Sequence, residues 1–477
     1  MMSAHPEMTD AEILLDQIDE ACRRLRIAPT TFGRQAVNDG KFVSRLQQGG
    51  RVTLQTVERV QRFIEEQGGS PAPALRSVIR DATGPAHNFR FYDNRQKYLM
   101  FVNTSSEKQI VADRALQQLT HSQPEPPAIR LLDGGTGDGT TLARLLRGTH
   151  RHYPWLPLYV VAKEISAENV RLMLDKMPDR FQEHPATVLV VTNLDYAHAP
   201  WLDPGSPIRA SAMVWQEASL PGTTAGEFEE AIAGLQPFVE RHWGVDVSPH
   251  SGHPVPRTPA VLVLYRRDQR FTLDSILPRR GAARADFDFV LLSHAYRARA
   301  PIAFKAERII APLVRALRRN GRLMGVQAYG QDPGMEIIRA IWPDENPFTT
   351  GRETLLRAVR AALGAEARRF RFHALSDEES LFRYPIHTLE SEISPTSEIG
   401  TSTLLAAWNA ASYVAQIEDA RLATVMNRNH YIDATRDALR KHSSLWFNDE
   451  TYLISRPAEL GQVLGSGATP SHPMGTT

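Results

Sequence analysis

The chain has 477 residues, of which 42% are hydrophobic and 23% are charged, and these globular values exclude a wholly disordered protein. Its 55 basic and 54 acidic residues give a formal net charge of +1, so global charge argues neither for nor against a nucleic-acid partner. The single cysteine, Cys22, excludes a disulfide framework and a metal cluster built from cysteines alone. Because the chain has no apolar run of about 18 residues and does not begin like a signal peptide, we expect a cytoplasmic protein without a membrane span.

The length predicts two domains, or one large domain with additions, and residues 10–67 predict a small all-α domain of short helices. We expect helices at 10–25, 30–37, 41–48 and 54–64, because apolar residues recur at helical spacing and turn residues separate the runs. This arrangement resembles the helix-turn-helix of phage repressors, whose third helix would lie in the major groove of double-stranded DNA. The resemblance implies that DNA is contacted by Lys41, Ser44, Arg45 and Gln48.

The local charge fits a DNA partner but leaves a second interpretation open. From Ala21 to Arg62, nine Lys or Arg residues stand against two Asp or Glu residues, which is the charge pattern that a phosphate backbone requires. Acidic residues in the first expected helix offset much of this charge, and short helical bundles also serve as docking or dimerisation modules. A homodimer is therefore the alternative. Residues 68–87, rich in Gly, Pro and small residues, predict a linker.

The stretch 128–142, AIRLLDGGTGDGTTL, predicts a buried strand that enters a tight, glycine-rich turn and then a helix. Gly135, Gly137 and Gly139 leave the backbone open to a ligand at the start of that helix. The spacing differs from a dinucleotide fingerprint, since Thr140 stands where a third glycine would fall. Asp133 would repel a phosphate group but attract a ligand that carries an ammonium or sulfonium group.

These residues resemble motif I of the class I S-adenosylmethionine (SAM)-dependent methyltransferases; the alternative is an ordinary glycine-rich turn. The resemblance implies SAM as cofactor, held by Asp133 and the three glycines. Glu164, just beyond an expected strand at 156–161, would accept both ribose hydroxyls. Asp195, with Asn193 as second choice, follows a strand at 187–192 and would take the adenine amino group. Each acid alone could also be a helix cap or a surface charge.

The resemblance implies an α/β fold over 88–457, a Rossmann-like class I methyltransferase sheet with helices on both faces. We expect the fourth strand at 287–296, then a helix at 303–320 that stops at Asn320-Gly321, and the fifth strand at 322–329. Residues 199–285 would then be an insertion on the substrate side. The alternative places the fourth strand at 211–220. We also expect a helix at 353–363, a sixth strand at 369–375, helices near 404–417 and 432–442, a last strand at 445–457 and a disordered tail at 458–477.

The segment before the first strand offers candidates for a lid over the cofactor. In the family that segment often closes over the methionine end of the cofactor, and the alternative is a packing helix with an aromatic stripe. The lid candidates are Tyr92, Lys97, Tyr98, Asn103 and Thr104.

Methyl transfer is an in-line displacement that depends on the position of the acceptor, and an oxygen or nitrogen acceptor can also need a base. By position, His294 and Tyr296 are the first catalytic candidates, with Trp215 and Glu217 next. The Asn/Asp/Ser-Pro-Pro-aromatic tetrad of DNA amino-methyltransferases is absent, since the corresponding place reads Ser-His-Ala-Tyr. The only cysteine, Cys22, lies in the helical N-terminal segment, which argues against pyrimidine carbon-5 methylation.

The sequence therefore predicts a methyltransferase for a small-molecule or other non-DNA acceptor. The alternative is a transcriptional regulator whose large domain senses SAM or a metabolite without turning it over. His250 and His253, with Asp246 as the nearest acid, lie among Pro and Gly residues, so we expect a loop there and no metal.

Overall fold

A computed structural model describes residues 10–47, 54–67, 95–247, 254–387, 393, 398–426 and 430–458. The chain divides into two compact units, Met1–Asn88 and Phe89–Thr477. The expected linker at 68–87 and the tail from 459 onward lie outside the described residues, as do Gln48, Thr53, Tyr92, His250 and His253. In the part of the chain that is described, no helix combines the length and the apolar character needed to cross a bilayer.

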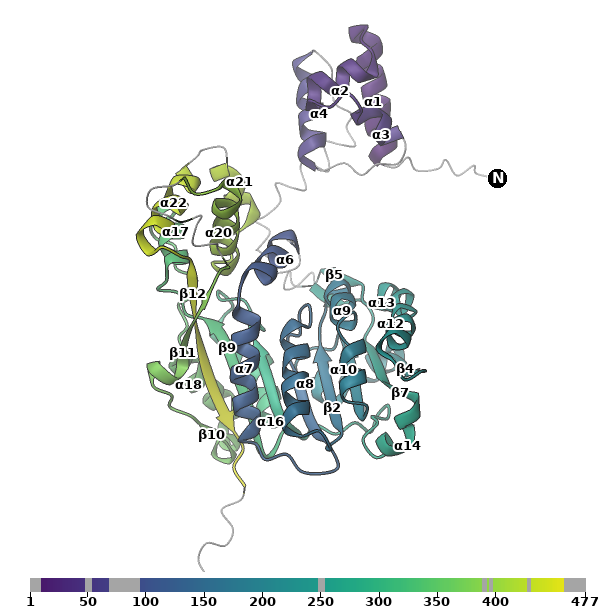
Figure 1. Ribbon diagram of the computed structural model, residues 1–477, viewed down its shortest axis with the longest axis vertical. Coiled ribbons are helices and arrows are strands. Elements are labelled where there is room, and N and C mark those ends of the chain that lie inside the picture. Colours follow the sequence, from purple (N-terminus) through teal and green to yellow (C-terminus); the bar gives the residue numbers. More distant parts are fainter. Residues whose placement is uncertain are drawn as a thin grey trace, which may run out of the picture. The chain divides into compact units, whose positions relative to one another are not determined.

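Among its described residues, the N-terminal unit has four helices: α1 (Asp10–Leu25), α2 (Pro29–Val37), α3 (Phe42–Gln47) and α4 (Leu54–Glu66) (Figure 1). They share a core in which Ile18, Phe32 and Val60 are fully buried. The rings of Phe32 and Phe63 meet edge to face, with centroids 5.3 Å apart, which ties α4 to α2. The apolar residues whose helical spacing predicted these helices therefore form the core between them.

A glycine fixes the close approach of α2 to the turn before α3. A Cβ at Gly33 would lie 2.4 Å from the carbonyl oxygen of Asp39. The N–H of Asp39 donates to the carbonyl of Gly33 at 3.1 Å, and Asn38 takes the left-handed conformation with φ +57°. Gly33 lowers helix propensity, but only glycine fits where the backbone turns back on α2.

The second unit is built around a mixed, mostly parallel sheet in the order β10-β12-β9-β8-β1-β2-β3-β7-β4, with β11 paired to β12. Strands β3, β2, β1, β8 and β9 run parallel, while β7 and β12 are antiparallel to β3 and β9. The strands are β1 (Ile129–Asp133), β2 (Leu158–Lys163), β3 (Thr187–Thr192), β4 (Val214–Leu220), β7 (Ala260–Arg266), β8 (Phe287–Ser293), β9 (Leu317–Ala328), β10 (Arg371–Phe372), β11 (Leu381–Pro385) and β12 (Trp446–Ser455). A separate two-stranded sheet pairs β5 (Val245–Val247) with β6 (Pro254–Pro256).

Helices cover both faces of the large sheet, as its near-continuous apolar strands require. One face packs against α7 (Glu107–Thr120), α8 (Thr140–His152), α9 (Ala167–Leu174), α10 (Pro178–Glu183), α12 (Ala225–Ala233) and α13 (Gln236–His242). The other packs against α14 (Arg270–Leu273), α16 (Ala311–Arg315) and α18 (Arg352–Leu363). The fold therefore has three layers, helix, sheet and helix (Figure 1).

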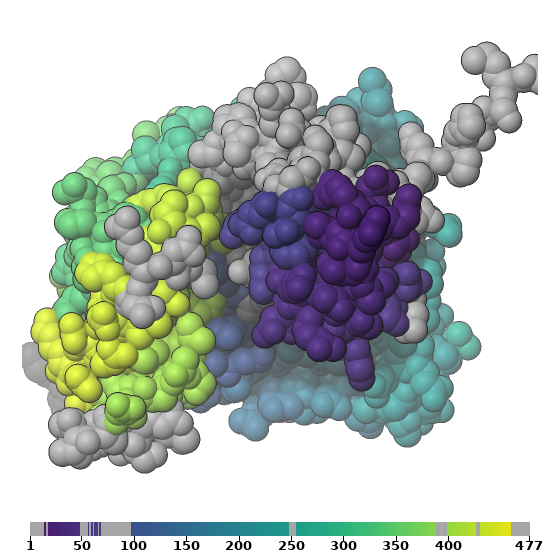
Figure 2. Space-filling model, turned by 90° about the horizontal axis from the view of Figure 1, so that it is seen from above, coloured from purple at the N-terminus to yellow at the C-terminus, as the bar shows by residue number. Residues whose placement is uncertain are grey.

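A third apolar cluster lies at the end of the sheet where β12 begins. It joins α6 (Arg95–Thr104), α17 (Pro333–Ile341), α20 (Thr401–Val414), α21 (Asp419–Met426) and α22 (His430–His442). Helices α17, α20 and α22 contact one another, and in Figure 2 the yellow-green C-terminal helices form one group on the surface. This group lies beyond the sandwich, on the side of the carboxyl end of β9.

Two segments, 287–296 and 211–220, were expected as alternatives for the fourth strand of the methyltransferase sheet, and the pairing partners of β1 decide between them. Strand β8 pairs with β1 in parallel register, Leu132 opposite Val290, so the expected strand at 287–296 takes that place. Strand β4, the alternative, lies at the far edge beside β7. The expected insertion at 199–285 therefore lies only partly outside the sheet, because its strands β4 and β7 extend the sheet beyond β3.

The expected helix at 303–320 begins within one residue of the observed start, but its C-terminal end was wrong. The helical turns run through α15 (Ile302–Phe304), a π-helix (Lys305–Ile310) and α16, which ends at Arg315. Leu317 already pairs with Phe287 and Arg322 pairs with Phe289, so 318–321 bulge from β9. The bulge is held where the Arg318 guanidinium meets the buried Asp288 carboxylate at 3.0 Å, and the expected Asn-Gly turn lies inside it.

Candidate functional site

A cavity of about 280 Å³ opens at the carboxyl ends of β1, β2 and β8, where ligands bind in open α/β sheets. Gly135 and Gly137 form one wall, and Glu164, His294 and Tyr296 reach it from the ends of β2 and β8. With the lid candidate Tyr98, the structure thus brings together six of the residues predicted from the sequence.

Glu164 lies at the centre of the loop contacts. Its Oε2 accepts from the N–H of Gly137 at 2.9 Å, and its Oε1 accepts from the N–H groups of Ile165 at 2.7 Å and Ser166 at 2.8 Å. A carboxylate offers about four acceptor positions, so the present hydrogen bonds leave one, on Oε2. Glu164 has room for one hydroxyl of a ribose diol, and the second hydroxyl requires Gly137 to release the carboxylate.

The three glycines of the loop have different reasons to be glycine. Gly139 precedes α8 with φ +79°, and a Cβ there would lie 2.6 Å from Met173, so Gly139 serves packing and does not line the cavity. Gly137 has φ +57°, and a Cβ would lie 2.7 Å from the Tyr98 hydroxyl. At Gly135 a Cβ would meet only ordinary contacts, the nearest at 3.5 Å from Ala295. Gly135 is therefore the position where only a ligand would require the absence of a side chain.

Tyr98 connects the expected lid to the glycine loop. Its hydroxyl donates to Asp138 Oδ1 and accepts from the N–H of Asp138, both at 3.0 Å, and Tyr98 lines the cavity. Burial, followed by the charge of Asp138, raises the pKa of Tyr98 well above its usual value, so the hydroxyl keeps its proton. Of the other described lid candidates, Lys97 pairs with Asp419, and neither Asn103 nor Thr104 lines the cavity.

Asp133 is buried behind the glycine loop. Its Oδ1 accepts weakly from the N–H of Gly135 at 3.4 Å. Burial raises the pKa of Asp133 to about 7, and Glu164 adds to the rise, whereas the Gly135 N–H and Lys108 oppose it. A nearby cation would lower the raised pKa of this buried carboxyl group and so favour its ionised form.

The structure does not bring Asn193 or Asp195 into the cavity. The Oδ1 of Asn193 accepts from the N–H of Ala260 at 2.8 Å and its Nδ2 donates to the carbonyl of Thr258 at 2.9 Å, so this side chain binds the start of β7. Asp195 is half exposed and pairs with His198 at 2.6 Å. Neither side chain lines the cavity, and their role as adenine contacts stays a prediction.

Tyr196 and Lys163 line the cavity in their place. The Tyr196 hydroxyl donates to the carbonyl of Ala295 at 2.8 Å, which joins the ends of β3 and β8. Lys163 is buried with its Nζ 4.5 Å from the centre of the Tyr196 ring, and burial lowers its pKa. Sequence reasoning missed both, although each is adjacent in sequence to a predicted residue.

His294 faces two buried acids. Its Nε2 lies 3.0 Å from Asp449 Oδ2 and 3.3 Å from Glu107 Oε1. Although burial alone would lower the pKa of His294, Asp449 and Glu107 raise it to about 10. The two acids therefore favour the protonated ring, and the catalytic role predicted for His294 stays a prediction.

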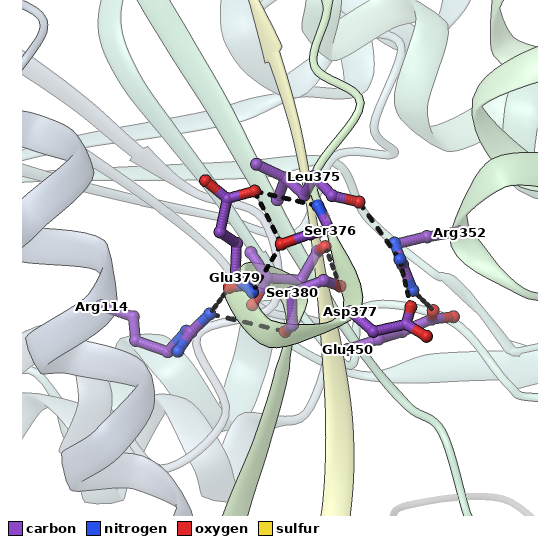
Figure 3. A network of polar contacts seen from close by, with 9 residues as sticks. Arg114, Arg352, Leu375, Ser376, Asp377, Glu379, Ser380 and Glu450 are labelled. Atoms are coloured by element: carbon purple, nitrogen blue, oxygen red, sulfur yellow. Dashed lines mark hydrogen bonds and ion pairs between the residues drawn. The ribbon is translucent and has the colours of Figure 1, made fainter.

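Tyr296 begins a chain of polar contacts that leads away from the cavity. Its hydroxyl donates to Gln327 Oε1 at 3.0 Å, and Gln327 Nε2 donates to Glu450 Oε1 at 2.6 Å. Figure 3 shows the outer end of this chain, where Arg352 lies between Glu450 and Asp377 and also donates to the carbonyl of Leu375. The position of Tyr296 thus depends on an ion pair between α18 and β12.

Lys305 is a cavity residue that the sequence did not reveal. It begins the π-helix, its side chain is buried, and its Nζ donates to the carbonyl of Ala298 at 2.7 Å. Burial lowers the pKa of Lys305 to about 8. A lysine of that kind can exchange a proton near neutral pH, and π-helical turns are often found at functional sites.

The remaining candidates lie away from the cavity. Trp215 and Glu217 do not line it, because β4 is at the edge of the sheet, and Glu217 accepts from the hydroxyl of Tyr265 at 2.6 Å. Asp246 pairs with Arg257. On α3 and the turn before it, Lys41, Ser44 and Arg45 are exposed, and Arg45 pairs with Asp39.

No protein-family model and no curated protein matches the chain. Similar solved structures include a geranyl diphosphate methyltransferase with sinefungin, 13% identical, with a TM-score of 0.27 over 72% of this chain and 78% of that one. A phosphoethanolamine N-methyltransferase from Haemonchus contortus with S-adenosylhomocysteine is 10% identical, with a TM-score of 0.26 over 72% and 53%. An uncharacterized protein from Burkholderia thailandensis is 13% identical, with a TM-score of 0.27 over 95% of both chains. Because these similarities are low, the function of this chain has to be inferred from the residues of its own cavity.

Proposed function

We propose that this protein is a SAM-dependent methyltransferase for a small-molecule or other non-DNA acceptor. One observation carries the proposal: the glycine loop and Glu164 line the same cavity as His294, Tyr296 and Lys305. A site that suits an adenosine-bearing ligand and polar side chains that could contact an acceptor thus share one space. The cofactor, when bound, supplies a methyl group on a positively charged sulfur.

Charge favours a sulfonium ligand over a pyrophosphate. Asp133 is buried behind the loop and Glu164 faces it, so two carboxylates stand where a dinucleotide would place its phosphates. Like charges at that distance would oppose binding, whereas a ligand with a sulfonium and an ammonium group would be attracted. Gly135 lets such a ligand lie against the backbone.

The acceptor side of the cavity assigns different tasks to its residues. Lys305, with its lowered pKa, is the candidate to take a proton from the acceptor. His294 lines the same space, and Tyr296, held by Gln327, would fix the orientation of the acceptor. Most of the rate enhancement would come from holding the acceptor in line with the methyl group.

A transfer assay tests the proposal. The purified full chain is incubated with SAM that carries a labelled methyl group and with a small-molecule extract of cells. The proposal predicts that label appears in a small molecule, and that it does not with Lys305→Met or Glu164→Gln. Tight SAM binding without transfer to any extract fraction would contradict an enzyme.

A SAM-sensing transcriptional regulator is the second candidate, because the exposed positive residues on α3 and in the turn before it suit a phosphate backbone. For this candidate, Lys41 and Arg45 would bind DNA. Selection of bound sequences from random duplexes tests it, with Lys41→Glu/Arg45→Glu as the variant. Arg357→Glu/Arg360→Glu, at exposed positions on the second unit, is the charge-matched control. A duplex that is bound more tightly with SAM present, without methyl transfer, would favour the regulator.

A further inference from the structure

Glu107, His294 and Asp449 come from three separate elements, the start of α7, the end of β8 and the strand β12. One ligand atom from each lies within 4.8 Å of the other two. Glu107 and His294 line the cavity, while Asp449 is buried behind them. We propose that these three side chains form a site for one divalent first-row transition-metal ion.

The first argument is that the cluster has more carboxylate oxygens that need a hydrogen-bond donor than it has protons to donate. His294 Nε2 carries at most one proton, yet it faces two carboxylate oxygens, at 3.0 Å and 3.3 Å. The nearer oxygen, Asp449 Oδ2, takes that hydrogen bond. Glu107 Oε1 points at the same nitrogen and has no hydrogen-bond partner among the described residues, although Glu107 is only 1% exposed. Asp449 Oδ1 is likewise buried without a described partner.

Buried carboxylate oxygens without partners are costly, and a metal ion would satisfy several of them at once. A proton makes one strong bond, whereas a metal ion bonds to all the surrounding ligands. The ion would replace the proton on Nε2 and leave His294 as a neutral ligand.

The second argument is geometric. Ligand atoms about 2.1 Å from an ion lie about 3.0 Å apart in octahedral and about 3.4 Å apart in tetrahedral coordination. The distances of 3.0 Å and 3.3 Å from Nε2 to the two carboxylate oxygens fall in that range. The backbone of His294 has φ +48°, a conformation that residues other than glycine rarely adopt, and it directs the ring from the end of β8 toward Glu107 and Asp449.

The third argument is charge. Lys108 contacts the other oxygen of Glu107, Oε2, at 3.5 Å, so it does not occupy the centre of the cluster. Two carboxylates, one ammonium and a neutral imidazole give a net charge of about −1, which attracts a divalent cation. One imidazole with two carboxylates suits Mn²⁺, Fe²⁺ or Zn²⁺ better than Mg²⁺, which prefers oxygen ligands alone. The cavity side would leave positions open to water or to oxygen atoms of a ligand.

Mn²⁺ binding to the untagged full chain, stripped with a chelator, tests the site. Equilibrium dialysis at pH 7.5 should give one Mn²⁺ per chain, and pulsed EPR should detect a histidine nitrogen coupled to the ion. His294→Gln, Glu107→Gln and Asp449→Asn should each weaken binding by about tenfold or more. His152→Gln, an exposed histidine on α8, should bind as the wild type does.

Circular dichroism spectra identify any variant that fails to fold, and the nitrogen coupling in the wild type does not depend on variants. Absence of stoichiometric binding at 1 mM Mn²⁺, on the scale of the weakest specific sites, would overturn the proposal, and the cluster would then be a proton-bridged ion pair. Binding without nitrogen coupling, or binding that all folded variants retain, would also overturn it. None of these outcomes bears on SAM binding, which is measured separately.

Discussion

The carboxylate of Glu164 accepts a hydrogen bond from the backbone N–H of Gly137 at 2.9 Å. The contact joins the end of β2 to the glycine loop after β1, and therefore holds the loop against the cavity. The same carboxylate has one acceptor position left for a ligand, so loop order and ligand binding depend on one side chain.

Replacement of Glu164 by Gln should weaken both the order of the glycine loop and the binding of SAM. The amide keeps one oxygen, but its NH₂ group would face backbone N–H donors, which costs about 1–3 kcal/mol for an unsatisfied buried donor. We expect SAM affinity to fall by about tenfold or more in calorimetric titrations. Glu168→Gln, four residues away and paired with Arg171 on the surface, is the control and should bind normally. Equal affinity of both variants would contradict the role of Glu164.

Alanine variants at two glycines should distinguish an effect on protein stability from an effect on SAM binding. Gly139→Ala places a methyl group 2.6 Å from Met173 at φ +79° and should cost about 1–3 kcal/mol of unfolding free energy. Gly135→Ala meets no close protein atom, so its stability should stay within about 0.5 kcal/mol of the wild type while SAM affinity drops about tenfold. Denaturant unfolding and calorimetry measure the two effects. A Gly135→Ala protein that binds SAM fully would show that no ligand lies against this backbone.

The raised pKa of Asp133, about 7, predicts a pH dependence of binding. A cationic ligand favours the ionised carboxylate, so SAM affinity should rise by about tenfold from pH 6 to pH 8 and then level off. In the protein without ligand, the contribution of Asp133 to folding stability changes with pH in the opposite direction. The folded state holds a proton that the unfolded state has lost, so this group's contribution to stability is lost as pH rises from about 4 to about 7. Asp133→Asn should remove both trends; a wild-type affinity that is flat with pH would contradict the prediction.

Lys305 should be visible in the pH profile of turnover. If the neutral amine accepts the proton of the acceptor, kcat/KM rises through a pKa near 8. Lys305→Met should lower kcat about 10²–10⁴-fold, and Lys305→Arg should be equally inactive because its guanidinium keeps its proton. Lys441→Met, at an exposed ion pair with Glu336, is the control. An active Lys305→Arg enzyme would mean that the site needs only a positive charge.

The ion pair between Arg352 and Glu450 should hold α18 to β12 (Figure 3). Arg352→Met leaves the buried carboxylate of Glu450 uncompensated, which should cost about 3–5 kcal/mol of unfolding free energy. Arg352→Met/Glu450→Gln should recover much of that loss, since the charge is then removed. Arg357→Met, exposed on the same helix, should change little. The pair has no such role if the single and double variants unfold at the same denaturant concentration.

The sequence predicted the parts of the site that follow from local pattern. The glycine loop, Glu164 and the strand that bears His294 are each adjacent to a buried apolar run, so their places at the carboxyl ends of strands could be anticipated. Asn193 was placed next to the correct strand, but the antiparallel β7 pairs beyond β3 and takes up its side chain through Ala260. Nothing in the local pattern showed that β7 would turn back there.

Contacts across long separations could not be predicted in the same way. Glu107, His294 and Asp449 meet only because α7, β8 and β12 converge, and each acid alone looks like a surface charge in its own segment. Lys305 was taken as part of a regular helix, but it is buried at the start of a π-helix that the sequence pattern did not predict. These residues required the three-dimensional fold.

A calorimetric titration of the purified full chain with SAM, and with NAD and FAD in parallel, tests the central claim most directly. We predict that SAM binds once per chain, more tightly at pH 8 than at pH 6, and that neither nucleotide competes with it. Saturable binding of NAD or FAD without binding of SAM would contradict the account.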